Sequence, residues 1–127
     1  MRRGILVLLA LWLHSPSTAG ESDVVDVKVS CDAESGCDFQ VTVLHADEGW
    51  DHYANRWEVL TPVGEVLATR ELAHPHENEQ PFKRSLRDVR IPDGVDEVVV
   101  RANDSVHGYG GMTMTVTLRR DQGGSAK

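Results

Sequence analysis

The sequence predicts an all-β protein built as a seven-stranded antiparallel sandwich. Apolar and polar residues alternate over most of residues 22–120, and no helical period persists for three turns. Turn signals rich in glycine, proline and aspartate divide the alternating stretches into seven short segments. Short strands with turns at this spacing are typical of two sheets packed face to face.

The expected strands are 24–31, 38–45, 56–62, 65–72, 82–91, 97–103 and 112–119. Period-two alternation predicts the inward faces of the first two strands as Val25, Val27, Val29 and Cys31, and Cys37, Phe39, Val41 and Val43. The last strand has the same pattern, with Met112, Met114, Val116 and Leu118 on one face and threonines on the other.

Turn chemistry supports the boundaries between these segments. Thr61-Pro62-Val63-Gly64 separates the third from the fourth, and Pro92-Asp93-Gly94 separates the fifth from the sixth. Within the fifth segment, Leu86 has the opposite parity from Val89 and Ile91, which predicts a bulge or break.

Residues 1–19 are predicted to be a secretory signal peptide. Arg2 and Arg3 form a positive start, residues 5–13 form an apolar run too short to cross a bilayer, and Ser17-Thr18-Ala19 offers small residues for cleavage. We expect cleavage after Ala19. The product is then periplasmic or secreted, with no membrane attachment after cleavage.

One domain is expected over residues 22–120, because a chain of about 108 residues supports a single modest core. Residues 121–127 are rich in glycine and serine and contain no apolar anchor. This composition predicts a disordered tail.

Without its leader the chain is strongly acidic. Loss of Arg2 and Arg3 leaves 11 basic residues against 20 acidic ones, a net charge near −9. This charge repels the phosphates of nucleic acid and anionic lipid, so neither is an expected partner. It is compatible with cation binding, although acidic surfaces more often serve solubility alone.

The two cysteines, Cys31 and Cys37, are predicted to form a disulfide. An exported chain meets oxidising surroundings, which favour this pairing. Both residues continue the apolar faces of neighbouring strands, so a tight connection places their sulfurs on one face. Zinc and redox motifs place two residues between their cysteines, whereas five lie between these.

Residues 85–118 resemble the later half of a fibronectin type III module. The resemblance rests on Leu86, Ile91-Pro92-Asp93-Gly94, the strand Val98-Val99-Val100-Arg101-Ala102, a glycine-rich loop and a final strand. The family's tyrosine in the strand after the Pro-Asp-Gly turn is missing here. The resemblance implies an immunoglobulin-like (fibronectin type III-like) antiparallel sandwich and concerns architecture alone.

The histidines outside the leader are predicted to gather at one end of the sandwich. Short connections make successive strands antiparallel, so alternate loops fall at opposite ends. Loops 46–55, 73–81 and 104–111 then share one end and are the longest. They carry His52, His74, His76 and His107, with His45 at the edge of the first loop. Long loops on a rigid sandwich often carry function.

Imidazoles surrounded by carboxylates suit a divalent transition metal. The candidate ligands are His52, His74, His76 and His107, with His45 as a further candidate that also fits a core-edge position. Pro75 favours an extended backbone in which the rings of His74 and His76 diverge, so both reach one ion only if the loop turns.

Copper or zinc is the expected ion, with iron less favoured. Met112 and Met114 would add a preference for Cu(I), although their parity with Val116 makes them core residues first. The residues expected to orient the ligands, or to line a binding surface, are Asp51, Glu79, Asp104, Trp50, Tyr53 and Tyr109. The glycines of residues 108–111 fit either a hairpin loop or a wall that closes on a ligand.

Two stretches resemble the iron-site loops of superoxide reductases, which are built on an immunoglobulin-like sandwich. His74-Pro75-His76-Glu77-Asn78-Glu79 is similar to part of their His-Pro…Glu-His segment, and Asp104-Ser105-Val106-His107-Gly108 to their Cys-x-x-His-Gly loop. Asp104 stands in place of the cysteine, and the second histidine of the first segment is missing. The resemblance implies a small iron enzyme.

As a whole, the chain resembles a family of small exported bacterial proteins of no established activity. These carry Trp-Asp-His-Tyr, His-Pro-His and Val-His-Gly-Tyr-Gly-Gly stretches, which occur here at residues 50–53, 74–76 and 106–111. This resemblance implies export and indicates no reaction.

Taken together, the sequence favours an exported, non-catalytic metal-binding sandwich whose partner is a metal ion or an exported protein. One alternative is an immunoglobulin-like module that binds a protein or ligand without metal. A second is a small metalloenzyme of the superoxide-reductase type. No catalytic residue is predicted, since Ser105 and His107 are too close in sequence to imply a triad and no phosphate loop occurs.

Overall fold

The computed structural model describes residues 20–34 and 36–119, and within them the chain forms strands and no helix. The strands are β1 (Asp23–Asp32), β2 (Gly36–Leu44), β3 (Ala54–Leu60), β4 (Val66–Glu71), β5 (Phe82–Val89), β6 (Glu97–Asp104) and β7 (Met114–Thr117). Each predicted segment corresponds to one strand, which confirms the all-β class. The predicted signal peptide and tail lie outside the described residues.

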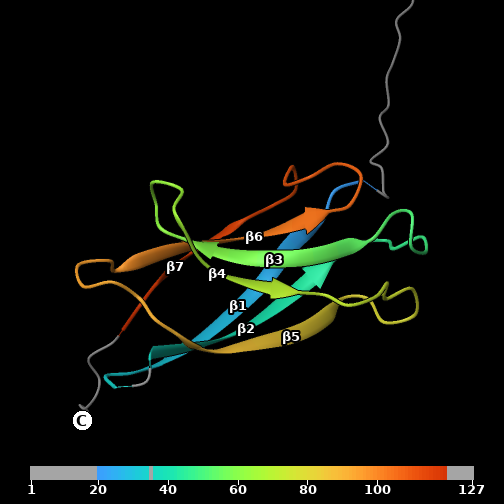
Figure 1. Ribbon diagram of the computed structural model, residues 1–127. Helices are drawn as coiled ribbons and strands as arrows, with labels where there is room; N and C mark the ends of the chain where they lie inside the picture. Colours follow the sequence, from blue (N-terminus) through green and yellow to red (C-terminus); the bar gives the residue numbers. More distant parts are fainter. Residues whose placement is uncertain (1–19, 35, 120–127) are drawn as a thin grey trace, which may run out of the picture.

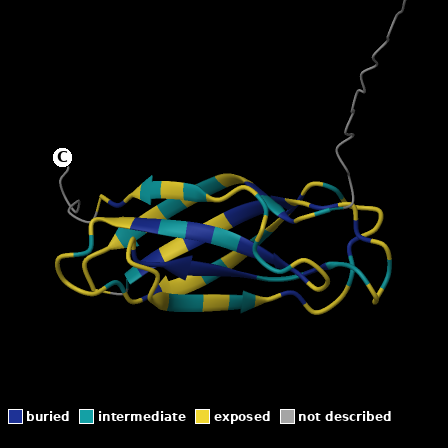
Figure 2. Cartoon of the chain, turned by 90° about the horizontal axis from the view of Figure 1, so that it is seen from above, coloured by how far each residue is buried: buried dark blue, intermediate teal, exposed yellow. Residues whose placement is uncertain are grey.

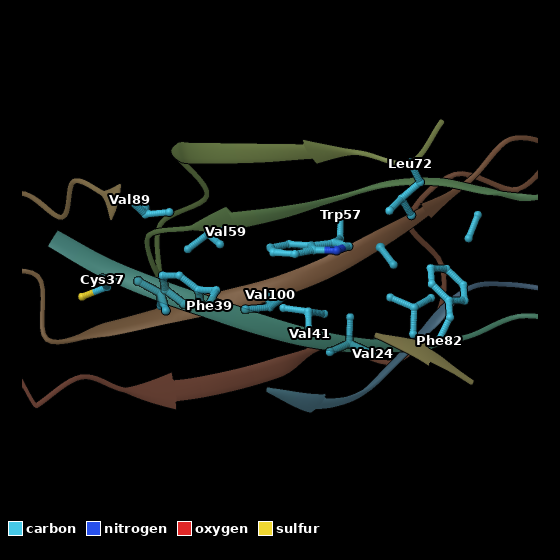
Figure 3. Packing of buried hydrophobic residues seen from close by; sticks show 14 of the residues in the cluster. Val24, Cys37, Phe39, Val41, Trp57, Val59, Leu72, Phe82, Val89 and Val100 are labelled. Atoms are coloured by element: carbon cyan, nitrogen blue, oxygen red, sulfur yellow. The ribbon is translucent and has the colours of Figure 1, made fainter. Parts of the chain in front are cut away.

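The strands form two antiparallel sheets (Figure 1). One has the order β1-β2-β5 and the other β4-β3-β6-β7. Side chains from both sheets meet between them, with Phe39 and Val41 of β2 lying near Trp57 of β3 and Val100 of β6 (Figure 3). Trp57 is the largest fully buried side chain. Replacing a buried side chain of this size by alanine typically costs about 3–5 kcal/mol of stability, so Trp57 anchors the core.

Burial follows the period-two pattern along most strands (Figure 2). In β2 the predicted inward residues Cys37, Phe39, Val41 and Val43 are all buried. Cys37 forms the predicted disulfide with Cys31, its direct partner in the β1–β2 register. This bond lies at the end of the sandwich opposite the histidine loops.

In β1 the predicted parity is wrong at its first member. A bulge lies between Val24 and Asp26, so Val25 has no partner of its own on β2. Val24 is fully buried, whereas Val25 is 36% exposed. Val27 and the residues of the same parity beyond it pack against the core as predicted. The extra residue reverses the pleat, which simple alternation cannot anticipate.

The irregularity predicted in the fifth strand is confirmed. Phe39 pairs with Leu86 and Cys37 pairs with Val89, so β5 has one residue more than β2 over this interval. Asp88 takes a positive φ of 58°, and its amide donates a hydrogen bond to Asp38 Oδ1 at 2.9 Å.

The last strand is shorter than predicted. It begins at Met114, and Met112 is 60% exposed, so the expectation that Met112 is a core residue is wrong. The backbone of Met112 instead contacts the start of β1, where its carbonyl accepts a hydrogen bond from Val24 at 2.9 Å. Met114 and Val116 pack partly against the core, and Leu118 is buried.

The three histidine-bearing loops lie at one end of the sandwich, as the antiparallel topology predicts (Figure 1). The β2–β3, β4–β5 and β6–β7 connections gather there, beside the beginning of β1. Several residues of these loops are buried, among them His45, Asp47 and His76. Buried polar side chains in loops need partners, and those partners define the site.

Candidate metal centre

Asp104, the last residue of β6, lies at the centre of the histidine end and is almost fully buried. Its Oδ1 accepts backbone hydrogen bonds from Val106 at 2.7 Å and His107 at 3.1 Å. The backbones of Asp104 and Gly108 also exchange hydrogen bonds at 2.9 Å. Gly108 has a φ of 77°, which glycine adopts without strain. One carboxylate oxygen thus shapes the loop and leaves Oδ2 for other partners.

Three imidazole nitrogens surround Oδ2 of Asp104. His45 Nε2 lies at 2.8 Å, His52 Nε2 at 2.9 Å and His107 Nδ1 at 3.1 Å. The rings of His45 and His52 are 4.9 Å apart, and those of His52 and His107 are 5.0 Å apart. The β2–β3 loop therefore supplies two rings, the β6–β7 loop supplies the third, and the end of β6 supplies the carboxylate.

His45 is held from behind by a second buried carboxylate. Its Nδ1 lies 2.6 Å from Asp47 Oδ1. Asp47 also accepts backbone hydrogen bonds from Ala54 at 3.1 Å and His76 at 2.6 Å, so its position is fixed by two neighbouring loops. A carboxylate only accepts hydrogen bonds, so Nδ1 of His45 carries a proton and Nε2 faces Asp104.

His52 repeats this arrangement closer to the surface. Its Nδ1 lies 2.9 Å from Glu48 Oε1, and its Nε2 points to Asp104. The backbone of this loop is closed by a hydrogen bond from Glu48 N to the carbonyl of His52 at 2.7 Å. Both histidines thus donate Nδ1–H to a carboxylate and direct Nε2 to the centre, the pattern that metal-ligating histidines use.

The carboxylates control the charge of the rings. Burial opposes a charge on His45, but hydrogen bonds and attraction from Asp47 and Asp104 outweigh it and raise the pKa of His45. Burial also opposes a charge on His52, whose pKa is raised by hydrogen bonds to Glu48 and Asp104.

The pKa values of Asp104 and Asp47 shift in the opposite direction to those of His45 and His52. Burial favours the neutral acid in each, yet hydrogen bonds from His107, the loop amides and His52 hold the pKa of Asp104 far below its usual range. Hydrogen bonds from His45 and two backbone amides lower the pKa of Asp47. The centre therefore combines ionised carboxylates with two imidazoles, those of His45 and His52, whose pKa values are raised.

The site also includes a backbone oxygen. The carbonyl of Gly20 lies 3.1 Å from His45 Nε2 and 3.1 Å from His107 Nδ1. The His107 side chain is 42% exposed, so the site opens to solvent on this side, whereas the His45 and Asp104 side chains are fully buried.

The donor atoms are close enough for one ion. One atom each from His45, His52 and Asp104 can be chosen so that all three lie within 4.8 Å of one another. Ligands bound at about 2.0–2.2 Å from a metal are separated by roughly 3–4 Å. The side chains would therefore have to move slightly closer together to share one ion.

His74 and His76 form a separate pair on the far side of Asp47. Their rings are 4.7 Å apart, so the loop turns at Pro75 rather than spreading them. His76 stacks on Phe82 at 4.1 Å, and its Nδ1 lies 3.9 Å from Asp47 Oδ2. Within residues 20–34 and 36–119, neither ring forms a hydrogen bond with Asp104 or a ring contact with a histidine of the central cluster.

The environment of His76 favours the neutral form of its ring. Burial and repulsion from Arg84 and His74 lower the pKa of His76. Its Nδ1 is buried without a hydrogen-bond partner among the described residues. His74 is exposed, and its Nδ1 lies 3.0 Å from the carbonyl oxygen of Pro75.

Two of the acidic residues proposed to orient the ligands lie away from the centre. Asp51 is exposed, and the carboxylate next to His52 is that of Glu48. Glu79 is exposed and pairs with Arg84 at 3.2 Å, which lowers the pKa of Glu79.

The three aromatic residues predicted near the site make contacts other than with Asp104. Trp50 is 66% exposed, and its ring contacts that of Tyr53 edge-on at 5.6 Å. Tyr109 is covered by the guanidinium of Arg101, 3.8 Å from the ring centre, and its hydroxyl accepts a hydrogen bond from Arg56 at 2.8 Å. Burial and a hydrogen bond to Glu58 raise the pKa of Tyr109.

The sequence predicts no specific role for Asp47, Glu48 or Gly20. Glu48 precedes His52 by four residues and Asp47 follows His45 by two, so their closeness in sequence is the signal that could identify them as partners of these rings. Which carboxylate meets which ring depends on the loop conformation, and a backbone carbonyl has no sequence signature at all.

Comparison with known proteins gives one informative similarity. Over 96 residues the chain is 44% identical to a protein of Halomicrobium mukohataei named "Putative lipoprotein". The alignment covers 76% of this chain and 47% of that relative, so the chain spans about half the length of the curated relative it matches. No model of a known protein family matches the chain, and no solved structure is significantly similar to it.

Residues 20–34 and 36–119 contain no helix with the length and apolar character that a crossing of the bilayer requires.

Proposed function

We propose that this protein binds one divalent transition-metal ion at its histidine end, with copper or zinc preferred over iron. The ligands would be Nε2 of His45, Nε2 of His52 and Oδ2 of Asp104, with Nδ1 of His107 as a fourth. Imidazole suits all three metals. The central support is the orientation of the rings: His45 and His52 each donate Nδ1–H to a carboxylate and direct Nε2 to the same oxygen.

Charge balance supports the same proposal. Without an ion, the carboxylates on both sides of His45 and of His52 favour a proton on every ring nitrogen. A divalent ion brings two positive charges, and the two Nε2 protons that it displaces take two positive charges away. The buried centre then keeps its net charge, which avoids the cost of an uncompensated charge.

We further propose that the protein is exported, non-catalytic and immunoglobulin-like in topology. The relative's name, "Putative lipoprotein", supports export, as do the predicted leader and the disulfide between Cys31 and Cys37. The sheet orders β1-β2-β5 and β4-β3-β6-β7 support an immunoglobulin-like or fibronectin type III-like sandwich. The rigid sandwich holds the loops, and burial of His45 and Asp104 favours holding an ion over turning over a substrate.

Metal titration of untagged protein tests this proposal. Zn(II), Cu(II) and Fe(II) would be titrated against the wild-type chain and a His52→Ala/His107→Ala double variant, and bound metal would be measured by elemental analysis. We expect about one ion per wild-type chain and a loss of at least tenfold in affinity in the double variant.

His74→Ala is the matched control, because His74 is a loop histidine at the same end that is not in contact with Asp104. Its affinity should equal that of the wild type. The proposal fails if wild-type stoichiometry stays far below one for each metal tried, iron included. It also fails if His74→Ala loses as much affinity as the double variant.

A recognition module without metal is the second candidate. The exposed Trp50, together with Val106 at 56% exposure, supports it, since both side chains lie in the loops that carry the histidines. Aromatic side chains in sandwich loops are common contact residues in binding proteins. Tight binding of a metal that is lost on substitution of His52 would favour the first candidate.

A further inference from the structure

Gly20 lies against the candidate metal centre. Its carbonyl oxygen is equally distant, at 3.1 Å, from His45 Nε2 and His107 Nδ1. Both nitrogens also face Asp104 Oδ2. The Gly20 oxygen therefore belongs to the same group of donor atoms as the proposed ligands, although it comes from the beginning of the described chain.

The glycine-rich β6–β7 loop holds the segment that follows Gly20. A Cβ atom at Gly111 would collide with the backbone of Ser22, whereas Gly110 lies against the exposed, flexible side chain of Glu21. The loop can approach Ser22 so closely because residue 111 has no side chain. Ser22 is completely buried as a result.

Hydrogen bonds continue this contact into β1. The amide of Met112 donates to Asp23 Oδ1 at 2.7 Å, and the carbonyl of Met112 accepts from Val24 at 2.9 Å. Figure 1 shows the blue beginning of β1 beside the orange β6–β7 loop. Residues 20–24 are thus fixed over the histidine end by the loop that also carries His107.

The sequence places a predicted cleavage point directly before this residue. Signal peptidase would hydrolyse the bond between Ala19 and Gly20, leaving a carboxylate on Ala19 and an α-amino group on Gly20. An α-amine has a lone pair localised on nitrogen that a metal ion can bind, whereas the lone pair of a peptide nitrogen is delocalised into the carbonyl. Its nitrogen and the carbonyl oxygen of the same residue can close a five-membered chelate ring on one ion.

We propose that the amino terminus created by this cleavage is itself a metal ligand, with Gly20 supplying its α-amino nitrogen and carbonyl oxygen beside His45, His107 and Asp104. This inference rests on the proposed metal function. It adds that the site is complete only in the mature chain, because the nitrogen of an intact Ala19–Gly20 peptide bond is not a comparable donor. Cleavage would then couple export to tight metal binding.

The test compares two forms of the protein. One begins at Gly20, and the other keeps Ser17-Thr18-Ala19 in front of it. Dissociation constants for Zn(II) and Cu(II) would be measured for each by competition with a chelator. We expect the form that begins at Gly20 to bind at least one of these ions at least tenfold more tightly.

A free amino terminus can bind copper weakly by itself, so both forms would also be made with His52→Ala. If the amine acts within the same site, the difference between the two forms should shrink to less than about threefold in this background. Intact mass of the protein exported from cells gives the natural first residue, which we expect to be Gly20.

The outcomes separate this inference from the proposed function. Equal affinities of the two forms would overturn the role of the amino terminus while leaving the metal site standing. An exported protein that begins at any other residue would also overturn it. Absence of binding in both forms would overturn the proposed function, and this inference with it.

Discussion

Nδ1 of His45 lies 2.6 Å from Oδ1 of Asp47, and this contact decides which nitrogen of His45 faces the centre. Asp47 is anchored by backbone amides of Ala54 and His76, so it holds the ring in one orientation. Nε2 is then directed at Asp104, 2.8 Å away. Two buried carboxylates on opposite edges of one imidazole explain why a histidine without an obvious structural need lies in the interior.

The carboxylate behind His52 should tune metal affinity without supporting the fold. Glu48→Ala removes the acceptor of Nδ1–H, and the side chain is 59% exposed, so little packing is lost. We expect metal affinity to fall about 10–100-fold and the free energy of unfolding to change by less than about 0.5 kcal/mol. Competition titrations and urea denaturation measure the two quantities.

Asp51→Ala is the control for this prediction. Asp51 precedes His52 directly and is exposed, but it is Glu48 that contacts the ring. Metal affinity should therefore stay within about twofold of the wild type. Equal losses in the Asp51 and Glu48 variants would mean that general negative charge, rather than ring orientation, governs binding.

Asp104→Asn should abolish tight metal binding while leaving the loop in place. An asparagine keeps an oxygen that can accept the amides of Val106 and His107, but it puts an uncharged group in front of the three imidazoles. We expect a loss of affinity of about 100-fold or more. Asp93→Asn, in the turn at the opposite end, should have no effect. Affinity near the wild-type value in Asp104→Asn would exclude Asp104 as a ligand.

The metal-free protein should be most stable in mildly acidic solution. The raised pKa values of His45 and His52 mean that these groups stabilise the fold below their unfolded value of about 6.5, and that this contribution is lost as pH rises through the folded values. The lowered pKa values of Asp47 and Asp104 give stability above about pH 4, which is lost as pH falls through the folded values.

His76 changes the pH dependence of stability in the opposite direction to His45 and offsets part of the contribution of His45. Its pKa is lowered, so it favours the fold at high pH and disfavours it as pH falls below about 6.5. The pKa values of two histidines are raised and that of one is lowered. We therefore expect the free energy of unfolding, measured with EDTA present, to decline from pH 5.5 to pH 8. Urea denaturation at these values measures it, and a rise over the interval would contradict the protonated state inferred for His45 and His52.

The disulfide should stabilise the fold without affecting the metal site. Cys31 and Cys37 close a short loop at the opposite end of the sandwich, which corresponds to about 2 kcal/mol of chain entropy. Cys31→Ala/Cys37→Ala should lower the free energy of unfolding by this amount and keep the wild-type metal affinity. A parallel loss of affinity would indicate that the site depends on overall stability.

Much of the fold follows from simple alternation, because strands such as β2 bury every second residue along most of their length. The register irregularity at Leu86 and Val89 was visible as a change of parity. The bulge at Val25 has no such signal in the sequence. Val25 has the same parity as Val27, Val29 and Cys31, so alternation alone places all four on one face. Met112 continued the pattern of β7 in sequence, yet the chain turns there to pair with the start of β1.

The sequence predicts where the candidate site lies better than it predicts which histidines belong to it. Topology alone gathers the histidine loops, because antiparallel strands send alternate loops to the same end. Within that end, His45 lies in the central cluster, whereas His74 and His76 lie beyond Asp47. Separating the two groups requires side-chain geometry, which depends on loop conformations that no local pattern specifies.

Anomalous diffraction from crystals of the mature protein grown with Zn(II) tests the central claim most directly. We predict one strong anomalous peak at the zinc edge, about 2 Å from Nε2 of both His45 and His52 and from Oδ2 of Asp104. A peak at His74 and His76 instead, or no ordered zinc at the histidine end in crystals that contain the metal, would contradict it.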